Sequence, residues 1–192
     1  KADWVLAHVR KASPRWVLDL GANNGALTRI VTGLGIRCIA LDSDASCVEE
    51  NFRRSREEGD RCMIPLLADP CNPPANLGWM GAERGALWGR LKPDLVMALA
   101  ILHHLRITHS LPMEGIARFF SNMGPALLIE FVPKEDPMVQ EMLQNRSDEF
   151  HDYTPAEFER CFGRLFATEE RSPIPGTART LYHLVRKEDA RN

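Results

Sequence analysis

The chain has 192 residues, 44% of them hydrophobic and 26% charged, and a formal net charge of −2. These values are typical of one soluble globular domain and argue against broad electrostatic binding to nucleic acid. No apolar run approaches the roughly 20 residues that a membrane helix needs. The five cysteines form no C-x-x-C pair, which disfavours a zinc site and favours reduced thiols in a cytoplasmic protein. We therefore expect a single domain over residues 1–192, with room for residues upstream because Lys1 is not a methionine.

The first predicted elements are a helix over residues 2–12 and a strand over residues 16–20. A tight loop containing Gly21 and Gly25 follows, and then a helical pattern begins. The apolar positions of that helix are spaced for one buried face: Leu27, Ile30, Val31 and Leu34. Strand, glycine loop and helix form the first unit of a doubly wound α/β sheet, and the amides at such a helix start offer hydrogen bonds to a ligand.

The loop reads Asp-x-Gly-x-x-x-Gly, which differs from the dinucleotide pattern G-x-G-x-x-G. Asp19 lies two residues before Gly21, where its charge would repel a phosphate and attract an ammonium group. At this point the chain resembles the class I S-adenosylmethionine-dependent methyltransferases, whose first motif has this shape. Asn23 occupies the place of that family's middle glycine, and asparagine tolerates left-handed backbone angles. An ordinary α/β turn is the alternative.

Two further acids follow the next two predicted strands. The strand over residues 35–41 ends at Asp42, 21 residues after Gly21, where a βαβ unit delivers a carboxylate to a ribose. Asp44 is expected to cap the next helix. The strand over residues 63–67 contains Pro65, which predicts an edge position, and Asp69 follows it. The resemblance implies that Asp69 accepts a hydrogen bond from an adenine amine.

Three acids at successive parallel strand ends lie along the edge of the sheet where ligands bind. Their expected partners are an ammonium, two ribose hydroxyls and an adenine amine, so we expect S-adenosyl-L-methionine, with S-adenosyl-L-homocysteine as product, and no metal. The expected cofactor-binding residues are Asp19, Gly21, Asn23, Asn24, Gly25, Asp42, Ser43, Ala68, Asp69, Pro70, Leu99 and Ala100.

Residues 70–92 predict a loop and a short helix, in which Trp79 either stacks on the base or fixes the loop to the core. The strand over residues 94–100 leads to two histidines. The resemblance implies that His103 faces the methyl donor or acceptor and that His104 anchors the next helix. A histidine can accept a hydroxyl proton near neutral pH. The alternative is one structural histidine and one at the solvent.

The helix predicted over residues 112–123 is followed by a strand over residues 126–132. Glu130 lies inside the apolar run of that strand, where an unpaired charge is costly. Its expected partner is Lys134, a histidine or the substrate. His103 and Glu130 are the candidate catalytic residues.

The last third of the chain predicts a helix over residues 136–146 and a polar, aromatic segment over residues 148–153, too polar for core. By resemblance, residues 133–154 form a substrate-side insertion. Thr154 opens a capping box, and strands over 165–168 and 180–185 predict a closing antiparallel hairpin. The expected fold is a Rossmann-like, doubly wound, seven-stranded α/β sheet, mostly parallel.

The predicted function is transfer of a methyl group to an oxygen or nitrogen of a small-molecule acceptor by in-line displacement. The resemblance extends to a largely uncharacterised bacterial group, some members of which are nodulation-associated. Alternatives are an RNA or protein methyltransferase and a non-catalytic interaction domain. A nicotinamide-dependent oxidoreductase would need G-x-G-x-x-G at residues 21–26. The acceptor and the oligomeric state are beyond the sequence.

Overall fold

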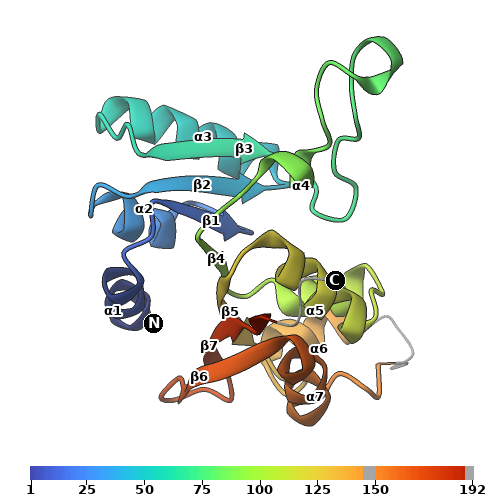
Figure 1. The fold of residues 1–192 in the computed structure, drawn as a ribbon. Helices are drawn as coiled ribbons and strands as arrows, with labels where there is room; N and C mark the ends of the chain where they lie inside the picture. Colours follow the sequence, from blue (N-terminus) through green and yellow to red (C-terminus); the bar gives the residue numbers. More distant parts are fainter. Residues whose placement is uncertain (145–149, 189–192) are drawn as a thin grey trace. The chain divides into compact units, whose positions relative to one another are not determined.

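The computed structural model describes residues 1–144 and 150–188. In this part of the chain the strands are β1 (Trp16–Leu20), β2 (Arg37–Asp42), β3 (Met63–Leu67), β4 (Leu95–Ala98), β5 (Ala126–Phe131), β6 (Phe166–Pro173) and β7 (Thr180–Arg186). They form one seven-stranded sheet in the order β3-β2-β1-β4-β5-β7-β6 (Figure 1). Strands β5, β7 and β6 pair antiparallel, while β1 pairs in parallel with β2 and β4. The predicted fold class is confirmed.

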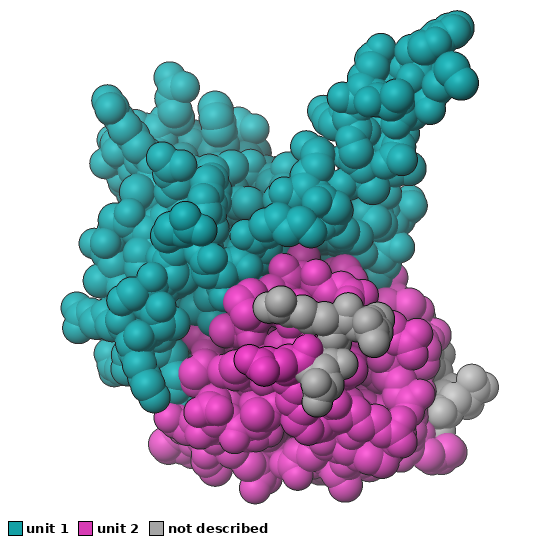
Figure 2. Space-filling view, in the orientation of Figure 1, with its two compact units in different colours: residues 1–97 teal, residues 98–192 magenta. Residues whose placement is uncertain are grey.

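The chain divides into two compact units, residues 1–97 and 98–192 (Figure 2). Within the described residues the helices are α1 (Ala2–Ala12), α2 (Ala26–Thr32), α3 (Ala45–Glu57), α4 (Leu87–Arg90), α5 (Met113–Met123), α6 (Pro137–Leu143) and α7 (Pro155–Leu165), with a 3-10 turn η1 (Trp79–Gly81) and a π turn η2 (His104–Thr108). The single-domain assignment and the insertion over residues 133–154 stay predictions.

Unit 1 contains three adjacent parallel strands whose carboxyl ends lie at one edge. In the register, Leu20 of β1 is opposite Leu41 of β2, and Asp42 is opposite Leu67 of β3. Successive right-handed crossovers in the same direction place α2 and α3 on one face of these strands. The loops that follow β1, β2 and β3 are therefore neighbours, as the strand-end acids require.

Helix α2 is shorter than the apolar pattern predicts. It ends at Thr32 with Gly33 as the C-cap, so Leu34 lies beyond the helix. Two of its buried residues are Thr28 and Thr32 rather than the partly exposed Leu27. Both threonine hydroxyls donate hydrogen bonds to aspartate side chains of unit 1. The apolar pattern was correct for the fully buried Val31, but it missed the two threonines, whose satisfied hydroxyls can face the interior.

Strand β3 is at the edge of the sheet, which confirms the prediction made from Pro65. Ala68 donates its amide hydrogen bond to the Asp42 carbonyl of β2, and alternate residues of a parallel strand turn the same way. Pro65 therefore faces away from β2, where its missing N–H costs no bond of the ladder. A proline at this place also blunts the free edge against pairing with another strand.

The segment between β3 and α4 extends away from the strands of unit 1 as a narrow arm (Figures 1 and 2). Leu77 and Arg84 pair across the base of its tip. At the tip the side chains of Trp79 and Met80 are 79% and 88% exposed. Trp79 thus does not fix the loop to the core. The tip of the arm is held instead by backbone hydrogen bonds between Leu77 and Arg84.

In unit 2 the antiparallel pairing of β6 with β7 confirms the predicted closing hairpin. The core of this unit is rich in aromatic rings, with Phe158 packed against Phe162, Tyr182 and Phe131. The predicted end of a helix at Arg146 lies outside the described residues.

The segment judged too polar for core is buried in part. Phe150 and Tyr153 are 7% and 2% exposed, while His151 and Asp152 between them are exposed. The Tyr153 ring stacks on Phe131, and its hydroxyl donates to the Val132 carbonyl at 2.7 Å. The burial of Phe150 and Tyr153 was not predicted, because their neighbours in the sequence are polar.

Candidate functional site

Asp19 is the most buried of the three strand-end acids. Its side chain belongs to β1, and the residue is 3% exposed. Thr28 of α2 donates a hydrogen bond from its hydroxyl to Asp19 Oδ2 at 2.6 Å. Burial raises the pKa of Asp19 to about 6, with the nearby charge of Asp42 as a smaller cause in the same direction, while the Thr28 bond opposes the rise. A cationic ligand would relieve the cost of this buried negative charge.

The loop after β1 has the backbone that its residues predict. Gly21 and Gly25 have φ of 77° and 71°, and Asn23 has φ of 48°. Asparagine therefore takes the left-handed conformation for which glycine is the usual residue. The Gly21 amide donates to the Leu41 carbonyl of β2 at 2.9 Å, which ties the loop to the neighbouring strand.

Asp42 at the end of β2 holds two loops through its carboxylate. Oδ2 accepts the Asn23 amide at 2.7 Å, and Oδ1 accepts the Asp44 amide at 2.9 Å. Each oxygen keeps a second lone pair with which it can accept a hydroxyl. Asp44 accepts the Ser46 amide, which confirms it as the cap of α3. Ser43 is exposed between these two acids.

Asp69 follows the end of β3. The residue before it, Ala68, is 7% exposed, while Asp69 and Pro70 are partly exposed. Oδ1 of Asp69 accepts the Cys71 amide at 2.7 Å. Its Oδ2 atom makes no hydrogen bond within the described ranges, so an acceptor remains for a ligand N–H. The donor and acceptor chemistry of unit 1 therefore fits an elongated ligand with an ammonium at one end and an amine at the other.

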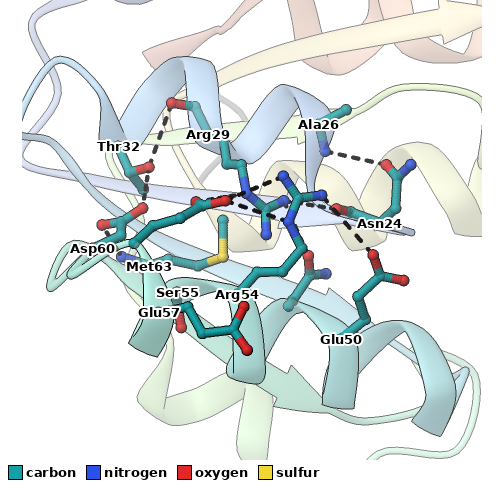
Figure 3. A network of polar contacts seen from close by, with 12 residues as sticks. Asn24, Ala26, Arg29, Thr32, Glu50, Arg54, Ser55, Glu57, Asp60 and Met63 are labelled. Carbon is teal, nitrogen blue, oxygen red and sulfur yellow. Dashed lines mark hydrogen bonds and ion pairs between the residues drawn. The ribbon is translucent and has the colours of Figure 1, made fainter.

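Two residues that hold the loop from behind were not predicted from the sequence. Asn51 of α3 is 1% exposed, and its Nδ2 donates to the Asn23 carbonyl at 2.7 Å. Arg29 of α2 donates from Nη1 to the Asn24 carbonyl at 2.7 Å and to Asn51 Oδ1 at 3.3 Å. Figure 3 shows Arg29 and Asn24 within this network.

Gly25 is expected to tolerate no side chain. An added Cβ would lie 2.3 Å from Asn51 Oδ1 and 2.7 Å from Arg29 Nη1, and the φ of 71° is itself unfavourable for alanine. We predict that overpacking in Gly25→Ala lowers the free energy of unfolding by about 1–3 kcal/mol in addition to the strain of the left-handed backbone. Gly35, with φ of 76° and open space around it, is the matched control, so Gly35→Ala is expected to cost only the backbone strain. Equal losses of stability, from chemical denaturation of both variants, would contradict the steric argument.

The remaining predicted site residues belong to unit 2. Leu99 is 7% exposed, and Ala100 has φ of 69°, so the chain turns sharply there and β4 ends at Ala98 rather than at residue 100. His103 is fully buried, while His104 is exposed and its ring lies 4.3 Å from that of His103. The burial of His103 and the exposure of His104 do not test whether His103 faces the methyl donor or the acceptor. That role of His103 therefore stays a proposal.

Glu130 is fully buried in β5 and has a cationic neighbour that was not among its expected partners. Arg179 Nη1 lies 3.6 Å from Glu130 Oε1, and Arg179 also binds Asp136 through two hydrogen bonds of 2.6 and 2.9 Å. The guanidinium holds the pKa of Asp136 below its ordinary value, with a smaller contribution from His103. Arg179 thus lies between two buried carboxylates, a cluster that local sequence does not reveal.

Among the residues that the structure describes, no group of three or more histidine, cysteine or acidic side chains is arranged to hold a metal ion. Within the same residues, none of the helices has the length and apolar character required to cross a membrane.

Comparison with known proteins adds one relative by sequence. The nodulation protein NoeA of Rhizobium meliloti (strain 1021) is 34% identical over 189 residues. The alignment covers 98% of this chain and 40% of NoeA, so the chain spans less than half the length of that relative. No family model matches the chain.

Solved structures resemble the chain throughout its length. The bifunctional kinase-methyltransferase WbdD has a TM-score of 0.66 at 17% identity, covering 96% of this chain and 38% of that one. Magnesium protoporphyrin IX methyltransferase (ChlM) from Synechocystis PCC 6803, crystallised with S-adenosylhomocysteine, has a TM-score of 0.65 at 17% identity, covering 97% and 82%. Likeness at this identity establishes the fold, and it is shared with methyltransferases.

Proposed function

We propose that this chain, which has the fold of the class I S-adenosylmethionine-dependent methyltransferases, binds S-adenosylmethionine in unit 1 and catalyses methyl transfer. The observation that carries the proposal is the set of acids Asp19, Asp42 and Asp69 at the ends of three adjacent parallel strands. A dinucleotide pyrophosphate would be repelled by the buried Asp19, whereas the α-amino group of S-adenosylmethionine would be attracted.

Each acid has a proposed role that follows from its surroundings. Asp19 holds the ammonium group, because its carboxylate is buried and a cationic ligand would offset the cost of that burial. Asp42 accepts ribose hydroxyls on lone pairs that its two backbone amides leave open. Asp69 accepts the adenine amine through Oδ2. The left-handed loop at Asn23 brings backbone rather than side chain toward the ligand.

The bound cofactor supplies a methyl group already activated on a sulfonium. The chain then has to orient an acceptor nucleophile, and well-placed reactants gain on the order of 7–11 kcal/mol. We propose a small-molecule acceptor with an oxygen or nitrogen nucleophile. For a hydroxyl acceptor, His103 takes the proton. Glu130, which lies beside Arg179, is the second proposed catalytic residue of unit 2. The likeness to ChlM, a methyltransferase of magnesium protoporphyrin IX, supports a small molecule rather than a macromolecule as an analogy.

The proposal is tested by titrating the whole chain with S-adenosylhomocysteine and, separately, with NAD⁺, followed by calorimetry. Binding of the first and no binding of the second is the expected result, because the site offers acids where a pyrophosphate needs amides and cations. NAD⁺ binding that S-adenosylhomocysteine fails to displace would replace the proposal with the oxidoreductase alternative. If neither ligand binds, the interaction-domain alternative is favoured.

His103→Ala is expected to lower turnover while leaving the affinity for S-adenosylhomocysteine within about threefold, because the role proposed for His103 is toward the acceptor and not toward the cofactor. Removal of a general base costs roughly 10²–10⁴-fold in rate. The exposed neighbour provides a control, since His104→Ala should change neither quantity by more than a small factor. Loss of cofactor binding in the His103 variant would refute its acceptor-side role.

A further inference from the structure

The loop that carries Asn23, Asn24 and Gly25 is held from behind by two helices. Asn51 and Arg29 bind the carbonyl groups of Asn23 and Asn24 through hydrogen bonds of 2.7 Å each. The amides of the same two loop residues turn to Asp42 Oδ2 and to Asn23 Oδ1. Successive peptide groups of the loop are therefore fixed at both polar ends.

Fixing a carbonyl also fixes the amide that follows it. In a trans peptide the C=O and N–H groups point in opposite directions. When the Asn23 carbonyl is held toward α3, the Asn24 amide is held away from α3. The same bond geometry directs the Gly25 amide, which donates to the Ala22 carbonyl at 2.9 Å. A loop fixed in this way keeps the Asn23 and Asn24 carbonyls on the side of the helices, away from a ligand on the other side.

The side chains that hold the loop are themselves fixed. Asn51 is 1% exposed, and its amide is oriented unambiguously because Nδ2 meets a carbonyl and Oδ1 meets the Arg29 guanidinium. Arg29 Nε lies 3.3 Å from Glu58 Oε2, and Glu58 is in turn bound by Arg54 at 3.2 Å. The network therefore extends from the loop along the last turns of α3.

Gly25 and this pair of side chains depend on each other. The space that a Cβ at Gly25 would occupy is filled by Asn51 Oδ1 and Arg29 Nη1. A glycine is thus needed here to admit the two side chains, in addition to its left-handed φ of 71°. The loop motif and the inner surface of α2 and α3 form one packed unit.

We propose that Asn51 and Arg29 are positioning residues, which set the affinity for the cofactor by holding loop residues 23–25 without touching the ligand. This inference rests on the proposed function of unit 1. Preorganised hydrogen-bonding groups bind more tightly because the ordering of the loop precedes binding. Loss of either side chain frees a carbonyl to rotate toward the ligand, where it would repel the carboxylate of an amino-acid moiety.

The test is calorimetric titration of S-adenosylhomocysteine into the wild-type chain and into Asn51→Asp, with thermal unfolding of each. Asn51→Asp keeps the shape and the contact with Arg29 but replaces the donor to the Asn23 carbonyl with an acceptor. We expect the affinity to fall roughly tenfold or more. Ser55→Ala is the matched control, because Ser55 is a buried polar residue one turn further on α3 whose hydroxyl donates to the Phe52 carbonyl within the same helix. That control should lower the melting temperature and leave the affinity within about twofold.

Arg29→Lys provides a second variant should Asn51→Asp fail to fold. Lysine keeps a charge for Glu58 but lacks the fork that reaches both the Asn24 carbonyl and Asn51. A several-fold loss of affinity in this variant supports the inference. Wild-type affinity in folded variants at both positions overturns the inference and leaves the proposed function intact. A wild-type chain that binds no S-adenosylhomocysteine overturns both.

Discussion

Asp19→Asn is expected to stabilise the chain while weakening the binding of S-adenosylhomocysteine by at least tenfold. Burial raises the pKa of Asp19 from 3.8 to about 6, which means that its charged form is costly in the folded state. Asparagine has nearly the same shape and can still accept the Thr28 hydroxyl bond of 2.6 Å. The substitution therefore removes the charge that attracts the ligand together with the cost of burying it.

The pH dependence of stability follows from the same shift. A carboxyl whose pKa is raised by folding binds its proton more tightly in the folded than in the unfolded chain. Its contribution to stability is therefore greatest below about pH 4, declines as pH rises to about 6, and stays low above that value. The full decline is about 3 kcal/mol, at roughly 1.4 kcal/mol for each pH unit between the two pKa values. Asp19→Asn should recover most of it at pH 7 and little of it at pH 4.

Thermal unfolding at several pH values, with and without S-adenosylhomocysteine, measures both effects. The wild-type affinity should fall below about pH 6, where Asp19 takes up its proton. Asp94→Asn is the control, since Asp94 is an acid of unit 1 that accepts the Arg15 and Trp16 amides at the opposite ends of the strands. This control should leave the ligand affinity unchanged. Undiminished affinity in Asp19→Asn would remove the ammonium role of Asp19.

Arg179→Leu is expected to lower the free energy of unfolding by about 3–5 kcal/mol, because a buried charge cluster loses its cation. Glu130 is fully buried and Asp136 is 7% exposed, and both lie beside the Arg179 guanidinium. The Arg179 hydrogen bonds lower the pKa of Asp136, so the stability they confer is present above pH 4 and is lost as pH falls through the lowered value. The difference from wild type should therefore shrink in strong acid.

Chemical denaturation at neutral pH is the measurement for Arg179→Leu. Arg171→Leu is its matched control on the same hairpin, since Arg171 lies 3.4 Å from Glu159 with both side chains about half exposed. Exposed pairs contribute roughly 0–1 kcal/mol, so this variant should stay close to wild type. A loss in Arg179→Leu no larger than in the control would show that Glu130 and Asp136 do not depend on the guanidinium.

The strand-end acids were predictable because their placement is local. Asp42 and Asp69 follow recognisable strands, and parallel pairing brings the ends of those strands to one edge. The cap at Asp44 and the edge position of β3 follow from single residues of known preference. Such features need no knowledge of distant partners.

The partners of buried polar groups were not predictable in this way. Arg179 reaches Glu130 because the antiparallel register sets Thr180 opposite Phe131, and sequence spacing does not specify that register. Asn51 lies in a heavily charged helix, where nothing local indicates that one amide faces a loop 28 residues earlier. The exposed Trp79 was misjudged because an aromatic residue in a loop is expected to pack on a core.

A crystal structure of the chain with S-adenosylhomocysteine tests the central claim most directly. We expect the amino group of the ligand beside the Asp19 carboxylate, its ribose hydroxyls on Asp42 and its adenine amine near Asp69. A ligand bound away from these three carboxylates, or a phosphate bound beside Asp19, would contradict that claim.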